Sequence, residues 1–188
     1  CTWCRLACGE WKIQLEILCE TSMPKKNSII DGCGRLIMSV LQYLVEIDER
    51  PDKRIPLGME GLLHIRQSLE ETLLTTTTYL NTAKRDGNTE STIVNVWAQL
   101  FSQMHQSTSK EAKNNIKCFK KLLMQSGDVS LIRALVHFIS MEENAIVVYE
   151  LGIIDPLFVF TERFWVNFAN ASGLSPCYQH EDMLYWAC

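Results

Sequence analysis

Residues 131–160 read Leu-Ile-Arg-Ala-Leu-Val-His-Phe-Ile-Ser-Met-Glu-Glu-Asn-Ala-Ile-Val-Val-Tyr-Glu-Leu-Gly-Ile-Ile-Asp-Pro-Leu-Phe-Val-Phe, and this stretch decides the fold. Apolar residues recur every three or four positions from Leu131 to Ile139, which is the spacing of one helix face. A short second helix, about Asn144 to Leu151, is expected to end at Gly152. Asp155-Pro156 then supply an N-cap and an N1 proline. The stretch predicts three helices joined by tight turns.

The same stretch resembles an armadillo-type repeat junction. In that family an apolar helix ends, an Asn begins a short segment ending in Glu-x-Gly, and a Gly-Ile-x-x-Leu run begins the next helix. The matching residues are Asn144, Glu150, Gly152, Ile153 and Leu157. Gly152 can adopt positive φ there, and Ile153 and Leu157 are expected against the Leu131 to Ile139 helix. The resemblance implies stacked α-hairpins, a diverged armadillo- or HEAT-like superhelix segment.

Helical spacing continues through the rest of the chain. The expected helices carry Leu6, Ile13 and Ile17; Ile29 to Ile47 after Ser28; Met59 to Leu80; Ile93 to Met104; and Ile116 to Leu123. Because short links join these helices and no strand pattern competes with them, the predicted fold class is all-α, with helix-on-helix packing between successive pairs. An irregular helical bundle is the alternative architecture.

Two local features are unusual for helices. Thr75 to Thr78 place four β-branched residues in a row, which lowers helix propensity. Gly32, Gly34 and Gly58 do not form a phosphate-binding loop, so we expect them to allow close approach between helices.

Composition bounds the class of protein. The chain has 188 residues, 47% hydrophobic and 21% charged, which is typical of a globular domain. We expect a single all-helical segment, residues 1–188, without a membrane span, because no apolar run approaches the roughly 18 residues required. It begins at Cys1 without Met and ends after apolar residues, so we expect a fragment of a longer repeat protein. Eight cysteines without the composition of a disulfide scaffold favour an intracellular location.

The chemistry-bearing residues are scattered. Cys1, Cys4 and Cys8 could begin a zinc or iron–sulfur site, but no second close pair supplies the fourth ligand, and with Cys19 they share one side of a helix. We therefore expect them to pack in the core. His64, His105, His137 and His180 show no metal or catalytic spacing. The sequence predicts no enzyme, no cofactor and no small-molecule substrate.

Two groups of residues are candidates for partner binding. The first is a basic stripe on one helix face, which could meet an acidic protein surface or a phosphate backbone but also suits a solvated face: Lys110, Lys113, Lys117, Lys120 and Lys121. The second is an aromatic group, Phe158, Phe160, Phe164, Trp165 and Phe168. Phe158 and Trp165 turn away from the face shared by Leu157, Phe164 and Phe168, so either the Met183 to Trp186 segment or a partner covers them.

These observations predict a noncatalytic scaffold for protein–protein interaction, with other proteins as its partners. The alternative is a nuclear, nucleic-acid-associated scaffold that uses the lysine stripe. Residues 142–188 carry seven acidic residues and one basic residue, a net charge of −6, so the two candidate surfaces differ in electrostatic character.

Overall fold

The computed structural model describes residues 2–20, 28–49, 58–82, 91–103, 109–125, 130–139 and 142–172. The helices in these ranges are α1 (Thr2–Glu20), α2 (Ser28–Glu49), α3 (Met59–Thr82), α4 (Ser91–Gln103), α5 (Ser109–Gln125), α6 (Ser130–Ile139), α7 (Glu142–Glu150) and α8 (Ile154–Ser172). No strand occurs in the described ranges, and the expected all-α class is confirmed.

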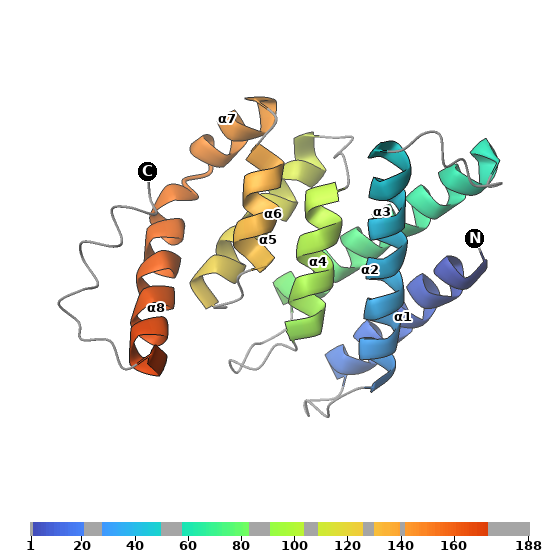
Figure 1. Ribbon diagram of the computed structural model, residues 1–188, viewed down its shortest axis with the longest axis horizontal. Helices are drawn as coiled ribbons and strands as arrows, with labels where there is room; N and C mark the ends of the chain where they lie inside the picture. The colour runs from blue at the N-terminus through green and yellow to red at the C-terminus, as the bar shows by residue number, and fades with distance from the viewer. Residues whose placement is uncertain are drawn as a thin grey trace.

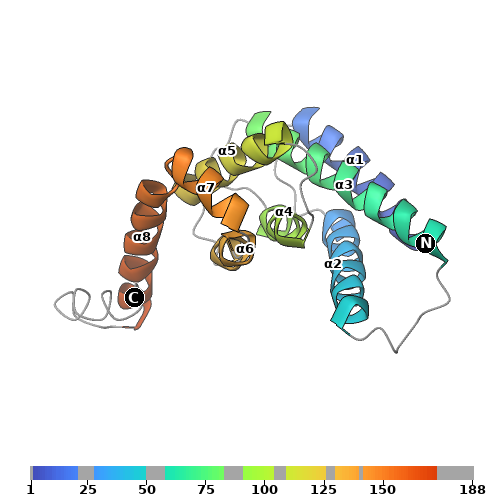
Figure 2. The ribbon, with the colours of Figure 1, turned by 90° about the horizontal axis from the view of Figure 1, so that it is seen from above.

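The helices form two rows (Figure 1). One row runs α1, α3, α5 and α8, and the other runs α2, α4 and α6, with α7 packed on α6. Neighbours within a row are two apart in the chain, except α5 and α8, which are three apart. Between the rows, α1 pairs with α2 and α3 pairs with α4. Figure 2 shows that the rows together make an arch, with α8 at one end and α1, α2 and α3 at the other.

The core lies between the rows and is centred on α4. This helix is buried on most of its circumference, through Ile93, Val94, Val96, Trp97, Ala98, Leu100 and Phe101. Trp97 stacks on Phe101 with ring centroids 5.1 Å apart, and Phe101 stacks on Phe138 of α6 at 4.5 Å. Met104, expected on the same face, lies outside the described residues.

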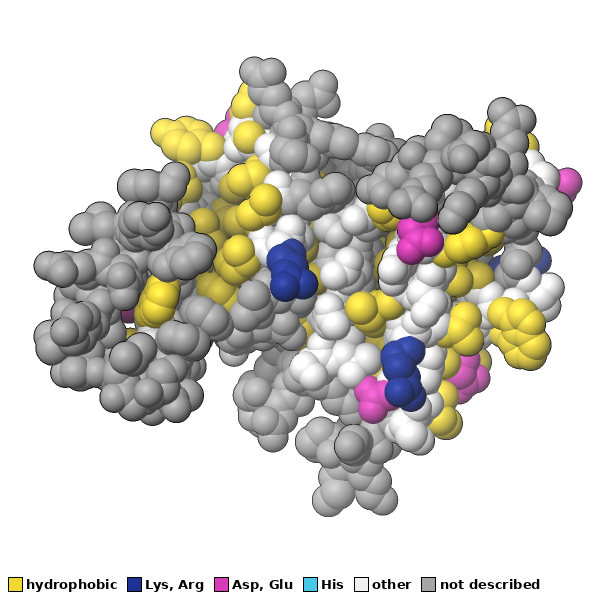
Figure 3. Space-filling model, in the orientation of Figure 1, with side chains coloured by type: hydrophobic (Ala, Val, Ile, Leu, Met, Phe, Trp, Pro, Cys, Tyr) yellow, Lys and Arg dark blue, Asp and Glu magenta, His cyan; other side chains and the backbone are white. Residues whose placement is uncertain are grey.

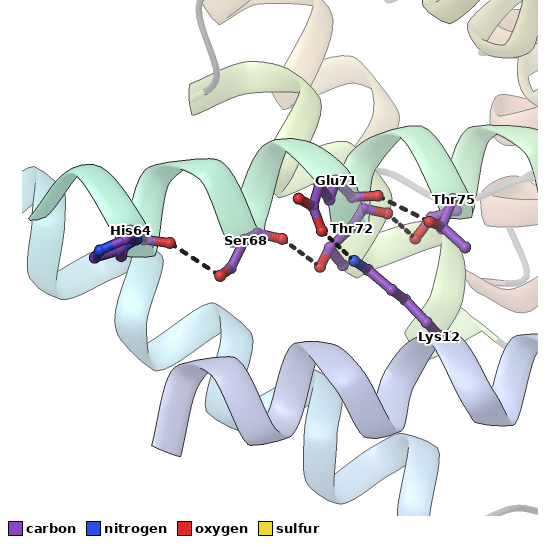
Figure 4. Close-up of polar contacts among 7 residues, drawn as sticks. Lys12, His64, Ser68, Glu71, Thr72 and Thr75 are labelled. Atoms are coloured by element: carbon purple, nitrogen blue, oxygen red, sulfur yellow. Dashed lines mark hydrogen bonds and ion pairs between the residues drawn. The ribbon is translucent and has the colours of Figure 1, made fainter. Parts of the chain in front are cut away.

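The threonine run does not interrupt α3. Each hydroxyl from Thr75 to Thr78 donates to the carbonyl four residues earlier, at 2.7 to 2.9 Å. Figure 4 shows the preceding part of this ladder, in which Thr72 and Ser68 make the same bond. Thr76 and Thr77 are buried, so the run supplies hydroxyl groups to the core.

Gly34 permits close packing of α2 on α4, as expected. A Cβ at this position would lie 2.9 Å from Cγ2 of Thr92, 3.1 Å from Cγ2 of Val96 and 3.2 Å from the Trp11 ring. The same expectation is wrong for Gly32 and Gly58, where a Cβ would meet nothing within 4 Å.

Helix α2 contains a longer apolar stretch than expected from the sequence. Residues Ser28–Ile47 have a mean hydropathy of 1.2 and are long and apolar enough to cross a membrane, although 28% of the window is buried. Ile30, Ile37 and Leu41 belong to the core. Because core helices of other proteins reach the same values, one such helix is weak evidence for a span.

Candidate protein-binding surface

The link between α7 and α8 is a tight turn at Gly152. Gly152 has φ +61°, and its N–H donates to the carbonyl of Tyr149 at 3.0 Å. The N–H of Ile153 reaches back to the carbonyl of Val148 at 3.3 Å. These two bonds are the Schellman motif, which requires a residue in the left-handed region and is usually ended by Gly. The expected turn and its positive φ are thus present.

The turn directs α8 onto α5. Ile153 is buried and Leu157 is partly buried against the core, while the main neighbour of α8 is α5 rather than the expected α6. Arg163 donates from Nη1 to the carbonyl of Met124, near the end of α5, at 2.7 Å. α8 begins at Ile154, one residue before the expected N-cap Asp155. Helix boundaries commonly shift by this much.

The aromatic residues of α8 divide into buried and exposed side chains according to their positions around the helix. Phe160 is 3% exposed and belongs to the core, whereas Phe158 is 65% exposed. Trp165, two turns beyond Phe158 on the same face, is half-buried. The side chains of Phe164 and Phe168, and the whole of Met183 to Trp186, lie outside the described residues.

Further apolar side chains flank Phe158. They are Ile154, Val159 and Val166, and with Phe158 and Trp165 they define what we call the α8 outer surface. The carboxylates of Asp155 and Glu162 are exposed on the same side of the helix, two turns apart. The surface therefore combines apolar rows with negative charge.

Next to this surface, α7 adds exposed apolar groups. Tyr149 is 74% exposed and Ile146 is exposed as well. Figure 3 shows hydrophobic side chains over the α7 and α8 side of the molecule, on the left of the view. The aromatic group in the sequence includes Phe158 but not Val159, Val166 or the isolated Tyr149, because a single apolar residue on a mixed helix gives no signal for exposure.

The lysine stripe on α5 splits into two roles. Lys121 donates to the carbonyls of Leu80 and Asn81 at 2.9 Å, at the end of α3. Lys120 donates to the carbonyl of Leu151, just after α7, at 3.3 Å. Both ammonium groups meet helix C-termini, where unpaired carbonyls and the helix dipole favour positive charge.

The remaining lysines leave a smaller basic surface than expected. Lys113 and Lys117 are exposed, and the side chain of Lys110 lies outside the described residues. In the face that Figure 3 shows, described Lys and Arg side chains lie in separate places. Two of the expected binding residues, Lys120 and Lys121, thus connect α5 to the ends of neighbouring helices.

Of the α1 cysteines that were expected in the core, only some are buried there. Cys4 and Cys8 are buried, whereas Cys19 is exposed, which corrects its expected burial, and Cys1 lies outside the described residues. The hydrogen bond from Cys4 lowers the pKa of Cys8 to about 7 despite burial, with smaller contributions from Thr72 and Lys12. The same bond, with burial, raises the pKa of Cys4. Within the described ranges no three His, Cys, Asp or Glu side chains gather as metal ligands.

One hollow lies elsewhere, between α2 and α4, with a volume of about 510 Å³. Asp31, Arg35 and Thr92 are among its lining residues, and Thr92 donates to Asp31 at 2.6 Å. Of the described histidines, His64 lies on α3, 3.7 Å from Glu60, and does not line the hollow. The hollow thus has a polar lining in which one hydroxyl is hydrogen-bonded to a carboxylate.

No family model, curated protein or solved structure matches this chain. The armadillo- and HEAT-type resemblance stays a prediction that rests on Asn144, Glu150, Gly152, Ile153 and Leu157. Any functional conclusion must come from the geometry of the surfaces described above.

Proposed function

We propose that this protein is a noncatalytic scaffold that binds other proteins, built from stacked α-hairpins of the armadillo- or HEAT-like kind. The two-row packing of the helices and the Gly152 turn support the architecture. Stacked hairpins create extended surfaces suited to protein partners. Buried free thiols at Cys4 and Cys8 support a reducing, intracellular setting.

The exposure of Phe158 is the observation that carries the proposal. At 65% exposure, this aromatic ring stands among four other apolar side chains of the α8 outer surface. Single exposed apolar residues are common, but a contiguous group containing aromatic rings is typical of binding surfaces. Aromatic residues also contribute much of the binding energy in known interfaces.

The test compares partners recovered with the full chain and with point variants. Phe158→Glu should remove the proteins captured by cross-linking from cell extract, because it places a charge at the centre of the apolar group. Leu74→Glu is the matched control, since Leu74 is 56% exposed on α3 and away from this surface. Recovery of the same proteins with Phe158→Glu as with wild type, at equal thermal stability, would contradict the proposal.

Nucleic-acid binding is the second candidate, supported by the exposure of Lys113 and Lys117 on adjacent turns of α5. A phosphate backbone would meet both ammonium groups, and binding would weaken as salt rises. The double variant Lys113→Glu/Lys117→Glu should then lose retention of double-stranded DNA or RNA in a gel-shift assay. Retention equal to wild type would remove this candidate.

A further inference from the structure

The hollow between α2 and α4 lies at the margin of a close helix contact. A Cβ at Gly34 of α2 would lie 2.9 Å from Thr92 and 3.1 Å from Val96 of α4. Asp31 and Met38, one turn before and one turn after Gly34, line the hollow on the α2 side. Figure 2 shows both helices on the inner side of the arch. The close packing of two helices therefore holds the walls of the hollow in place.

Two opposite charges, Asp31 and Arg35, line the hollow without pairing with each other. They lie four residues apart on α2, a spacing at which Asp and Arg ordinarily form an ion pair. Here the carboxylate of Asp31 instead accepts the hydroxyl of Thr92 at 2.6 Å. In the part of the chain that the structure describes, the exposed guanidinium of Arg35 makes no ion pair. A carboxylate and a guanidinium are thus both directed at one hollow but are available to different partners.

The α4 side of the hollow carries uncharged polar side chains. Ser91 and Asn95, one turn apart, line it together with Thr92. Within the described ranges, neither the hydroxyl of Ser91 nor the side-chain amide of Asn95 makes a hydrogen bond. Figure 3 faces the row of α2, α4 and α6 and shows white, uncharged polar or backbone atoms over α4. The hollow therefore offers hydrogen-bonding groups on both of its walls.

Among the described residues, the charges that line the hollow balance. Helix α4 contains no charged residue, and Glu46 of α2 lies about 16 Å along the helix from Arg35 and accepts from Gln42. Of the other helices that contact α2 or α4, α1 and α3 lie behind them in the outer row, and α6, with the exposed Arg133, lies on the other side of α4 (Figure 2). A ligand of either sign would meet one attraction and one repulsion at the hollow, whereas a ligand with both charges would meet two attractions.

The size of the hollow and the spacing of its charges restrict the ligand further. The volume of about 510 Å³ falls within the range of small-molecule sites, about 300–1,000 Å³. Residues four apart on a helix have Cβ atoms about 5–6 Å apart, so a ligand that joins Asp31 to Arg35 needs its two charges on a short skeleton. An α-amino acid carries its ammonium and carboxylate groups on one carbon. Its side chain then has Met38 as an apolar neighbour.

We propose that the hollow between α2 and α4 binds a free α-amino acid with an apolar side chain. The ligand carboxylate accepts hydrogen bonds from the guanidinium of Arg35 and the amide of Asn95. The ligand ammonium donates to Asp31, whose other carboxylate oxygen keeps the bond to Thr92. The amino acid is bound and not transformed, and it joins α2 to α4. The inference is independent of the α8 outer surface and of its partners.

The experiment measures binding of L-leucine to the full chain by isothermal titration calorimetry. Two matched ligands test its charges separately, since L-leucinamide lacks the carboxylate, N-acetyl-L-leucine lacks the ammonium group, and both keep the side chain. Each should bind about tenfold more weakly than L-leucine, because each loses a charge-assisted hydrogen bond and brings its remaining charge near one of the same sign. Sodium acetate, which offers a carboxylate alone, should also bind more weakly than L-leucine.

Single charge removals show which protein group meets which end of the ligand. Arg35→Gln should weaken binding of L-leucine about tenfold and remove the preference for L-leucine over L-leucinamide. Asp31→Asn should weaken it similarly and remove the preference over N-acetyl-L-leucine. Because Arg35 is exposed and an Asn at position 31 can still accept the Thr92 hydroxyl, circular dichroism should find both variants folded.

The matched controls are Arg133→Gln on α6 and Glu60→Gln on α3, which remove exposed charges away from the hollow and should bind L-leucine as wild type does. Amide shifts in NMR titrations with L-leucine should cluster around Met38, Thr92 and Asn95. Four outcomes would overturn the proposal. They are failure of L-leucine to bind, equal binding of acetate or of either leucine derivative, unchanged preferences in both charge variants, and amide shifts confined to other helices.

Discussion

The indole N–H of Trp97 on α4 donates to the hydroxyl of Thr77 on α3 over 2.9 Å. One position earlier on α3, Thr76 accepts the indole N–H of Trp11 from α1 at 3.0 Å. Both tryptophans are completely buried, and a buried donor without an acceptor is costly. Adjacent threonines thus satisfy two large core side chains and connect α3 to α1 and α4.

Thr77→Val should therefore destabilise the protein by about 1–3 kcal/mol, because the near-isosteric methyl group leaves the Trp97 N–H unpaired and removes the 2.7 Å hydrogen bond between Thr77 and Asn115 of α5. Thr78→Val is the matched control, since Thr78 is exposed and bonds only within its own helix among the contacts described. Urea unfolding midpoints measure the difference. Equal midpoints for the two variants would show that the bonds of Thr77 to Trp97 and Asn115 contribute nothing to stability.

Two neighbouring glycines of α2 should respond in opposite directions to alanine. Gly34→Ala places a methyl group 2.9 Å from Thr92 and 3.1 Å from Val96, and this overpacking should cost about 1–3 kcal/mol. Gly32→Ala meets open space and should stabilise the helix by about 0.5–1 kcal/mol. Thermal midpoints of the two variants should lie on opposite sides of wild type; a shift in the same direction would contradict the packing of α2 on α4.

Local pattern was sufficient to predict the helices and the Gly152 turn, because helical spacing and the need for positive φ are properties of a few consecutive residues. It could not predict which of two apolar rows on α1 enters the core. Leu6 and Ile13 were expected in the helix and are exposed, while Trp11 and Leu15 are buried. That choice depends on Thr76, 65 residues away from Trp11.

The candidate site shows the same division. The exposure of Phe158 follows from its place on a helix whose other side faces the core. The roles of Lys120 and Lys121 do not follow from the stripe they form, because their carbonyl partners lie 31 to 41 residues away. A charged row on one helix looks alike whether it is solvated, binds a partner or holds neighbouring helix ends.

Lys121→Gln tests the structural role of the stripe. Losing the ammonium contacts with the last carbonyls of α3 should cost about 0.5–1.5 kcal/mol. Lys117→Gln removes an equivalent charge from the exposed side of the same helix and should change stability by less than about 0.5 kcal/mol. Denaturant midpoints that respond equally to both substitutions would contradict a specific role for Lys121.

The hydrogen-bonded thiols of Cys4 and Cys8 on α1 predict a pH dependence of stability. The folded pKa of Cys8, about 7, lies below its ordinary value of 9.0, so the unfolded chain binds more protons between these values. Stability should rise from pH 7 to pH 9 and fall above pH 9, where Cys4, with a raised pKa, keeps a proton that the unfolded chain loses. Cys8→Ala should abolish the rise in thermal midpoint under reducing conditions. A rise equal to that of wild type would assign it to other groups.

Gly152→Val should destabilise the protein by about 1–3 kcal/mol through its backbone, because φ of +61° is unfavourable for a β-branched residue. Crowding adds little, since a Cβ would meet only Nζ of Lys120, at 3.8 Å. Gly152→Asn separates these causes. Asn tolerates the left-handed region, so this variant should keep much of the stability that Gly152→Val loses, although its side chain is larger than a methyl group. Denaturant midpoints should therefore rank wild type above Asn and Asn above Val. Equal losses for Asn and Val would show that space rather than backbone conformation requires glycine, and an unchanged Val midpoint would remove the turn as support for the stacked-hairpin architecture.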